Sequence, residues 1–372
     1  MIKDIKVRTV GEKGPRTIKI DTKVNRIETP TRTLTSFEDN YKSNVDLDKL
    51  SNKWDFIYPN EIYEITTQID QETINNLLEK NGAFQRMIQK FNPLIVKNSQ
   101  ERLILFYPKV TKSTLLNEDA IEIILLLQMR LGLEIVSIPD SKSTFNYTTY
   151  IKHVDKARKY LASKEYEGDI IPYIDMETEH SAFKQKINFL ISEGYQAIGL
   201  TSRSIDFSIL NLKYIEKELR DKDVWFHMSG VNRYYKRATS GAHIPQLFGV
   251  DTTSTLIQQG GGSATDLSRV KMFEQNNLQY ELLAELKEGL GQKSCGCPIC
   301  KGKDSESFIS TYSKTKRMQQ SSALLDRYCK IHETFASHEQ FAKTKNMINS
   351  NEFLDYYNSK KGLKQTGFLD KK

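Results

Sequence analysis

The sequence contains no stretch that approaches 18 consecutive uncharged apolar residues, so it predicts no transmembrane helix. Its first residues, Met1-Ile2-Lys3-Asp4-Ile5-Lys6, lack the apolar core of a secretory signal peptide. Only four cysteines occur in 372 residues, and three of them are clustered, which fits a reducing compartment. We therefore expect a cytoplasmic protein without a membrane partner.

Glycine motifs for nucleotide phosphates are also missing. No G-x-G-x-x-G follows a first strand, which argues against a dinucleotide-binding protein. Gly260-Gly261-Gly262 follows a predicted strand, but neither Lys-Ser nor Lys-Thr comes after it. We interpret this glycine run as a flexible loop near the site rather than a phosphate loop.

The composition is that of a globular protein, with 38% hydrophobic and 27% charged residues. The net charge is +7 and the isoelectric point is about 8.9. A basic balance of this size favours a polyanionic partner such as a nucleic acid.

Short apolar runs alternate with helical patterns from about residue 100 onwards. The predicted strands are 102–107, 133–138, 169–174, 196–200, 223–228 and 246–251, and the predicted helices are 120–131, 148–163, 180–193 and 207–220. This alternation predicts a parallel sheet. With the strand candidates before residue 100, it predicts an α/β fold of the (β/α)₈ TIM-barrel type, and an open doubly wound sheet is the alternative.

Three domains follow from this pattern. Residues 1–50 contain half-exposed strand patterns at 16–20 and 26–30, and we expect them to pack on the barrel as an N-terminal β segment. Residues 51–290 would form the barrel. Residues 291–372 would form a zinc-binding helical subdomain.

Cys295, Cys297 and Cys300 lie within six positions, and glycine and proline residues between them force tight bends. Such a knuckle directs several thiolates at one centre, as a tetrahedral zinc ion requires. A fourth ligand must come from elsewhere in the chain. The residues alone leave three candidates, Cys329, His332 and His338.

Three predicted strands end in an aspartate, namely Asp140, Asp175 and Asp251. The carboxyl ends of barrel strands meet at one pocket, so these side chains are candidates for a shared active site. Each could instead cap a helix. Two or three carboxylates in one pocket suit glycosyl chemistry. Met228, at another strand end, is either a core residue or a platform for a flat ligand.

The cysteine spacing, followed by His332-Glu333-Thr334-Phe335, resembles the zinc motif of the tRNA-guanine transglycosylases. Members of this family are zinc-containing (β/α)₈ barrels that exchange guanine in a nucleic acid for a 7-deazaguanine. The resemblance implies that His332 is the fourth ligand and that the zinc ion is structural.

Other segments are similar to the family's in the same order. They are Arg26-Ile27-Glu28-Thr29-Pro30, Gly194–Leu200, His227-Met228-Ser229-Gly230-Val231 and Phe248-Gly249-Val250-Asp251. The resemblance implies that Asp140 holds the edge of the base and that Met228 packs on its face. It also implies that Gly199 and Leu200 line the base pocket.

Two departures from the family concern its catalytic aspartates. Ser254 stands where the family has its nucleophile, and the strand ending Phe106-Tyr107-Pro108-Lys109 lacks the family's Asp-Ser-Gly motif. Asp251 is then the best available nucleophile, with Asp175 as the second catalytic residue. The departures favour the family's DNA-modifying branch over a tRNA enzyme.

The sequence leaves two other functions open. The protein could be a non-catalytic, zinc-stabilised subunit that binds nucleic acid, or a hydrolase that removes the base without replacing it. The resemblance also implies a dimer.

Overall fold

The computed structural model describes residues 1–11, 13–43, 45–46, 57–111, 113–140, 146–202, 204–236, 239–256, 266–286, 296–300, 303–314 and 320–369. Two predicted features, Cys295 and the glycine run 260–262, lie outside these ranges. None of the helices within them has the length and apolarity that a membrane crossing requires.

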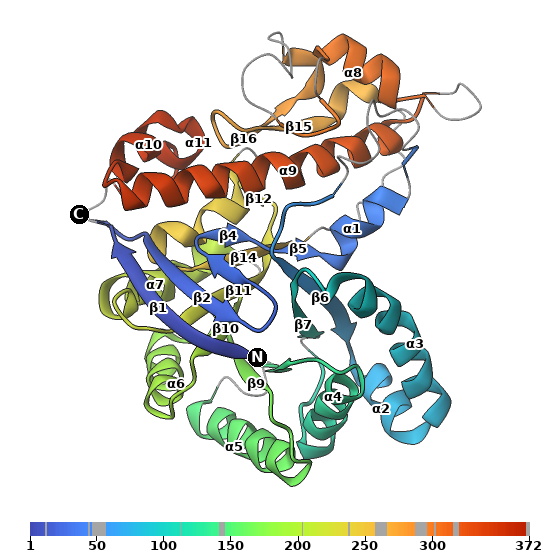
Figure 1. Cartoon of the computed structure of the whole chain (residues 1–372), viewed down its shortest axis with the longest axis vertical. Helices are drawn as coiled ribbons and strands as arrows, with labels where there is room; N and C mark the ends of the chain where they lie inside the picture. Colours follow the sequence, from blue (N-terminus) through green and yellow to red (C-terminus); the bar gives the residue numbers. More distant parts are fainter. Residues whose placement is uncertain are drawn as a thin grey trace.

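A parallel sheet of six strands occupies the centre of the molecule (Figure 1). Its order is β4 (Thr31–Arg32), β14 (Thr252–Leu256), β11 (Trp225–Asn232), β10 (Ala197–Thr201), β9 (Asp169–Asp175) and β8 (Ile135–Ile138). The helices α4 (Glu118–Arg130), α5 (Tyr147–Ser163), α6 (His180–Ser192) and α7 (Ile205–Tyr214) alternate with the strands. The predicted alternation and the predicted parallel sheet are therefore confirmed.

A second parallel sheet contains β5 (Leu34–Thr35), β6 (Ile62–Ile69) and β7 (Leu103–Val110). It shares a segment with the first sheet, because only Thr33 separates β4 from β5, and its N–H donates to the Thr253 carbonyl at 2.9 Å. At the other edge, the Ser137 hydroxyl of β8 donates to the Phe106 carbonyl of β7. The two sheets are thus in contact at both edges.

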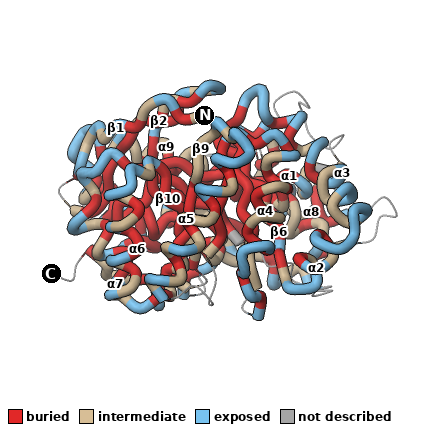
Figure 2. Tube along the Cα trace, turned by 90° about the horizontal axis from the view of Figure 1, so that it is seen from below, coloured by how far each residue is buried: buried red, intermediate tan, exposed pale blue. Residues whose placement is uncertain are grey.

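Helices α2 (Gln71–Glu79) and α3 (Asn81–Asn98) follow β6, and α1 (Ser36–Ser43) follows β5. The N-terminal sheet is antiparallel and contains β1 (Ile2–Val10), β2 (Arg16–Thr22) and β3 (Arg26–Glu28). Strands were predicted at the positions of β2 and β3. Figure 2 shows the buried chain concentrated in the strands and the inner sides of the surrounding helices.

The N-terminal sheet covers the N-terminal ends of the parallel strands. Its isoleucines pack in one cluster with the first residues of those strands, including Ile62, Leu103, Ile135, Ile171 and Trp225. Backbone N–H groups of β1 donate to acidic side chains at the start of two strands, Ile2 to Asp169 and Val7 to Asp223. This end of the parallel strands is therefore closed to solvent.

The C-terminal part contains a four-stranded sheet of β12 (Tyr234–Tyr235), β13 (Thr239–Ser240), β16 (Gln279–Leu282) and β15 (Lys271–Glu274). Its helices are α8 (Ser305–Tyr312), α9 (Ser322–Asn349), α10 (Phe353–Ser359) and α11 (Lys361–Lys364). The long helix α9 packs on β15, β4 and α1, and Figure 1 shows it crossing one side of the molecule.

The strand predicted over 246–251 is wrong. Pro245–Phe248 forms a short 3₁₀ helix, η6, which follows another, η5 (Gly241–His243). Gly249 then takes a left-handed conformation, with φ of 80°, that ends the helix. The parallel strand β14 begins only at Thr252, so the apolar run before Asp251 is buried without being a strand.

Candidate functional site

Asp251 lies before β14 rather than at its end, which corrects the predicted placement. Its side chain is 0% exposed and forms an ion pair with Arg16, whose Nη2 and Nε lie 2.5 and 3.0 Å from the two carboxylate oxygens. The N–H of Phe226, the second residue of β11, donates to it at 2.8 Å. Asp251 is therefore at the closed, N-terminal end of the strands and does not join Asp140 and Asp175.

Asp140 and Asp175 do lie together, at the carboxyl ends of β8 and β9. The Asp140 carboxylate accepts a hydrogen bond from the Asp175 N–H at 2.8 Å and one from Lys186 Nζ at 3.0 Å. Lys186 belongs to α6, and its ammonium lies 4.5 Å from the centre of the Tyr150 ring of α5. Asp140 is thus directed into the layer of helices, where its charge is matched by Lys186.

Asp175 lies on the same strand face as Tyr173, because side chains alternate along a strand. Its carboxylate accepts a hydrogen bond from the Glu177 N–H at 2.8 Å. Burial raises its pKa to about 6, and the nearby Asp140 carboxylate contributes in the same direction. Asp175 therefore changes its charge near neutral pH, as a group that transfers protons must.

Leu200 and Met228 are fully buried on the outer side of their strands. They belong to the core cluster that includes Phe183 and Ile187 of α6. They lie on the opposite face of the sheet from Gly199, which pairs with Tyr173 of β9. A Cβ at position 199 would come 2.5 Å from the Tyr173 ring. The expected base-binding roles of Leu200 and Met228 therefore have no support in their packing, whereas Gly199 makes room for Tyr173.

A buried polar network, which the sequence analysis missed, joins the two parallel sheets. At its centre is Glu64 of β6, which is 0% exposed. Its carboxylate meets His227 Nε2 at 2.8 Å and accepts hydrogen bonds from Ser229 at 2.6 Å and Ser254 at 2.9 Å. Thr66 donates to it at 2.8 Å.

The network continues on both sides of the carboxylate. The Tyr173 hydroxyl lies 2.9 Å from Ser229 Oγ, and His227 Nδ1 lies 2.7 Å from Thr252 Oγ1. Ser229 and Glu64 both approach the same nitrogen of His227, so the residues do not form a Ser-His-acid triad. They form a hydrogen-bonded carboxylate buried between the sheets.

The charge of Glu64 is set by two opposing effects. Burial raises its pKa, but the hydrogen bond and charge of His227, together with hydrogen bonds from Ser229 and Thr66, lower the pKa below the ordinary value. Glu64 is therefore held ionised, whereas Asp175 gains or loses its proton near pH 6. The sequence does carry a signal for this residue, since Glu64 and Thr66 alternate with the apolar Tyr63 and Ile65.

Cys297, Cys300 and His332 converge on one buried point. The two Sγ atoms are 2.9 Å apart, and His332 Nδ1 lies 2.9 Å from Cys300 Sγ and 3.4 Å from Cys297 Sγ. His332 Nε2 lies 2.9 Å from the Phe273 carbonyl. An Nε2–H that donates to this carbonyl makes Nδ1, which is directed at the two cysteine sulfurs, the nitrogen that can bind a metal. This is the usual support of a histidine ligand.

The donor set therefore fits a metal ion. Among the residues that the structure describes, this is the one group of three or more His, Cys, Asp or Glu side chains placed to hold one. Cys329 and His338, the other candidates for the last ligand, lie on α9 as His332 does but are not part of the group. Cys295, predicted as a further ligand, lies outside the described residues.

Comparisons with known proteins assign no family to the chain. No family model matches it, and no curated protein matches it. A solved structure from Burkholderia cenocepacia J2315, whose title provisionally names a phosphonomutase, is similar with a TM-score of 0.35 and 10% identity, over 61% of this chain and 86% of that one. A likeness at this level shows neither the family nor the function of the chain.

Proposed function

We propose that this protein is a transglycosylase that exchanges guanine in a nucleic acid, with DNA favoured over tRNA, for a 7-deazaguanine base. The observation that carries the proposal is the contrast between two carboxylates. Glu64 has a lowered pKa, and the pKa of Asp175 is about 6. Glycosyl chemistry uses such a pair, one carboxylate that stays ionised and one that gives and takes a proton.

We further propose that the two parallel sheets form one (β/α)₈ barrel. The shared β4–β5 segment, the Ser137–Phe106 hydrogen bond and the contacts of Glu64 with β11 and β14 all support closure. In such a barrel Asp175 lies at the carboxyl ends of the strands, where barrel enzymes have their active sites.

Each carboxylate then has a distinct task. As the bond between C1′ and N9 of the target guanosine breaks, Asp175 protonates the departing guanine. Glu64 supplies the negative charge that stabilises the cationic sugar. Ser229 and Ser254 donate hydrogen bonds to the Glu64 carboxylate. Covalent attack on the sugar would require Glu64 to give up some of these hydrogen bonds, whereas electrostatic stabilisation keeps all of them. In the second half, Asp175 accepts the N9 proton of the incoming base as the new bond to C1′ forms.

The cysteine–histidine group would hold a structural zinc ion. Cys297, Cys300 and His332 supply three ligands, and Cys295 would supply the fourth. A complete shell of four protein ligands leaves no position for a reactive water, so the ion stabilises the fold around α8 and α9.

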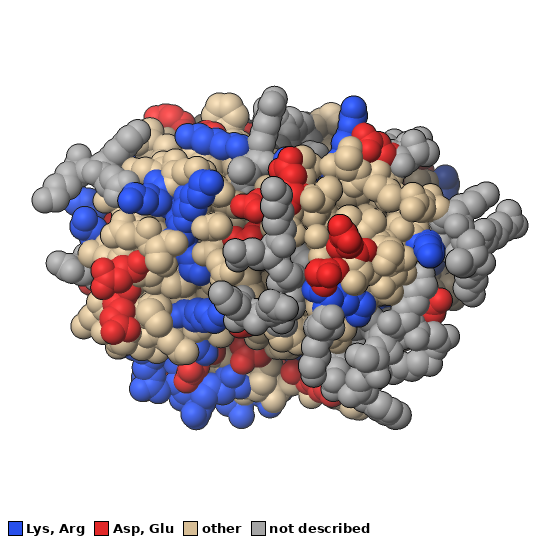
Figure 3. Space-filling model, turned by 90° about the horizontal axis from the view of Figure 1, so that it is seen from above, with Lys and Arg blue, Asp and Glu red and all other residues tan. Residues whose placement is uncertain are grey.

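A nucleic-acid partner is supported by the net charge of +7. The charge is not uniform over the surface. Figure 3 shows one face on which the densest group of basic side chains lies at the lower edge, with acidic side chains beside it and both kinds scattered over the rest of the face.

A base-exchange assay tests the proposal. Purified protein is incubated with DNA or tRNA that carries radiolabelled guanine, with and without an unlabelled 7-deazaguanine. We expect release of label from DNA that depends on the added base. Asp175→Asn should reduce the rate at least 100-fold, since general acid–base catalysis contributes about 10²–10⁴-fold. Glu179→Gln, which changes an exposed acid four residues away, should leave the rate unchanged.

Three other results would identify a different function. Release from tRNA alone would indicate a tRNA enzyme. Release that is independent of the added base would indicate a hydrolase. No release from either polymer, with metal bound and the protein folded, would favour the non-catalytic subunit, which the complete burial of Glu64 also favours.

A further inference from the structure

Four arginine side chains are buried in the described part of the chain, and they differ in how well they are satisfied. Arg16 uses Nε, Nη1 and Nη2 in hydrogen bonds to Asp251 and to backbone carbonyls. Arg102 likewise uses all three nitrogens, with Asn60, Asn98 and Tyr58 as acceptors. These two arginines are structural, because each guanidinium nitrogen has an acceptor.

The other two, Arg32 and Arg233, are left incomplete. Arg32 is 1% exposed, and only its Nη2 is engaged, with Glu38 and with Thr255 at 3.0 Å. Its Nε and Nη1 have no partner. Arg233 is 6% exposed and meets Glu333 through Nη2 at 2.5 Å, while its Nε has no partner. A buried N–H without an acceptor costs about 1–3 kcal/mol, so an acceptor that completes these groups would be favoured.

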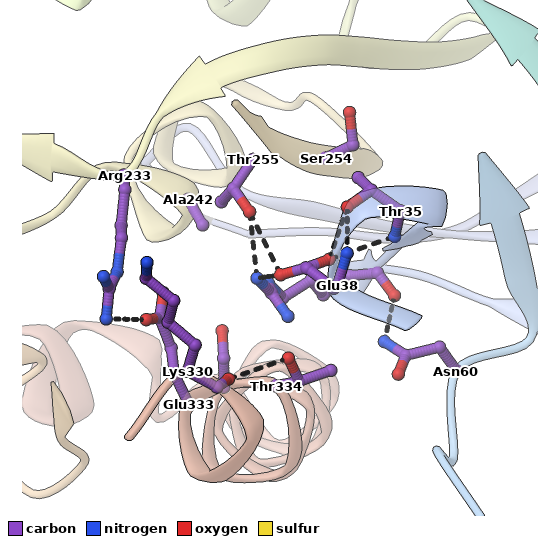
Figure 4. A network of polar contacts seen from close by, with 12 residues as sticks. Thr35, Glu38, Asn60, Arg233, Ala242, Ser254, Thr255, Lys330, Glu333 and Thr334 are labelled. Atoms are coloured by element: carbon purple, nitrogen blue, oxygen red, sulfur yellow. Dashed lines mark hydrogen bonds and ion pairs between the residues drawn. The ribbon is translucent and has the colours of Figure 1, made fainter. Parts of the chain in front are cut away.

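Both arginines lie near the same helix, because Arg233 pairs with Glu333 of α9 and Arg32 belongs to β4, which packs on α9. Arg32 lies on β4 and reaches the far end of β14, and Arg233 comes directly after β11. Figure 4 shows Arg233 and the Glu38–Thr255 group on the strand side, opposite Glu333 of α9. β11 and β14 are the last two strands of the parallel sheet along the chain. In α/β barrels, the chain after the last two strands frequently forms a phosphate site.

We infer that Arg32 and Arg233 form a binding site for a phosphate-class oxyanion between the parallel sheet and α9. The unpaired N–H groups supply donors with the planar geometry that suits phosphate oxygens. The Arg233 guanidinium lies 4.8 Å from the centre of the Tyr280 ring and 5.2 Å from that of Tyr234, which fixes its orientation.

The charge balance of the cluster selects the kind of oxyanion. Glu38 pairs with Arg32, and Glu333 pairs with Arg233, so the two cations are already matched by two carboxylates. A monoanion such as a phosphodiester is therefore better accommodated than a dianion. The source is a nucleic-acid backbone, a choice that rests on the proposed function, or a free phosphate.

Isothermal titration of the full-length protein tests this site with two probes, dimethyl phosphate and inorganic phosphate. We expect saturable binding of dimethyl phosphate and a loss of at least tenfold in affinity in Arg32→Lys and in Arg233→Lys. Lysine keeps the charge but loses the planar set of donors. Arg102→Lys is the matched control at a satisfied arginine, and it should leave the affinity unchanged.

Thermal unfolding of the same proteins without phosphate separates binding from stability. Arg102→Lys should lower the melting temperature more than Arg32→Lys, because it breaks hydrogen bonds at all three guanidinium nitrogens. Competition between a 10-mer of DNA and dimethyl phosphate would identify the nucleic-acid backbone as the source of the bound phosphate group. Binding of inorganic phosphate without competition by DNA would support the site with free phosphate as its ligand.

The inference is overturned if neither probe binds saturably, or if both lysine variants bind like the unmodified protein. These measurements need no base exchange. A chain that binds phosphate but exchanges no base would refute the proposed function and leave this site standing.

Discussion

At the scale of single residues, Asp251 is the clearest case in which position decides the role. Its carboxylate and the Arg16 guanidinium are both fully buried, and they are matched to one another. Asp251→Asn removes the negative charge and leaves Arg16 without a counter-ion in a dry environment. We expect a loss of about 3 kcal/mol in the free energy of unfolding, measured by urea denaturation.

The matched control replaces both partners. Arg16→Met combined with Asp251→Leu removes both charges, so it should recover at least half of the stability lost in Asp251→Asn. If Asp251→Asn instead kept its stability and lost all base exchange, Asp251 would be a catalytic residue and its structural role would be refuted.

Asp175 predicts a pH dependence with a definite sign. Its pKa is raised from 3.8 to about 6 on folding, so the folded protein binds the proton more tightly than the unfolded chain does. The contribution of this group is therefore most favourable below about pH 4, and it is lost as the pH rises to about 6. The full difference is about 3 kcal/mol, because each pKa unit corresponds to about 1.4 kcal/mol.

Asparagine at position 175 cannot be charged, so it avoids this loss. We expect Asp175→Asn to be more stable than the unmodified protein at pH 7.5, and the gain should shrink at pH 5. Urea denaturation at both pH values measures it. A gain of equal size at both pH values would show that Asp175 does not titrate in this range.

At the scale of elements, the cysteine–histidine group connects the knuckle to α9. Metal analysis should find one zinc ion per chain, and Cys300→Ser and His332→Ala should each abolish it. Cys329→Ser is the matched control. Cys329 is also buried and lies on α9, but it is not part of the cysteine–histidine group. Cys295→Ser should abolish zinc binding as the other ligand substitutions do.

Removal of the ion should also unfold its surroundings. A strong chelator should raise the proteolytic sensitivity of α8 and its flanking residues, since the free energy of metal binding contributes to folding. Full resistance after complete removal of the ion would contradict a structural role.

The same scale shows how far the sequence predicts the fold. Strands β8 to β11 and the helices between them were predictable. Each strand is a short apolar run, and in each helix the apolar residues recur with helical spacing. β14 was misplaced, since Pro245 and Gly249 turn an apolar run into a 3₁₀ helix. β6 was missed because half of its eight residues are polar, namely Glu64, Thr66, Thr67 and Gln68. The domain boundaries remain predictions.

The candidate site was less predictable than the strands. Cys297 and Cys300 are three positions apart, so spacing alone reveals them. Glu64 and His227 are 163 positions apart and meet only after both sheets have formed. Leu200 and Met228 follow residues that face inward, and a shift of one position along a strand exchanges the two faces. No local pattern specifies that direction.

At the scale of the whole molecule, the parallel strands have two unlike ends. The N-terminal end is filled by isoleucines of β1 to β3 and by the Arg16–Asp251 pair. The polar groups of Glu64, Ser229 and Ser254 lie farther along the strands, and Asp175 lies at the opposite end. The molecule therefore separates an end closed by apolar packing and a buried ion pair from an end that carries the groups of the proposed chemistry.

The Arg16–Asp251 pair has a consequence for the order of events during protein synthesis. Arg16 leaves the ribosome early, but its partner is 235 positions further along the chain. Until then, the isoleucines of the N-terminal sheet have no completed set of strands to cover. Contacts of such long range slow folding and prolong the exposure of apolar surface. The N-terminal sheet is thus made before the strands that it covers, and a nascent chain halted before Asp251 would leave the apolar side of that sheet exposed.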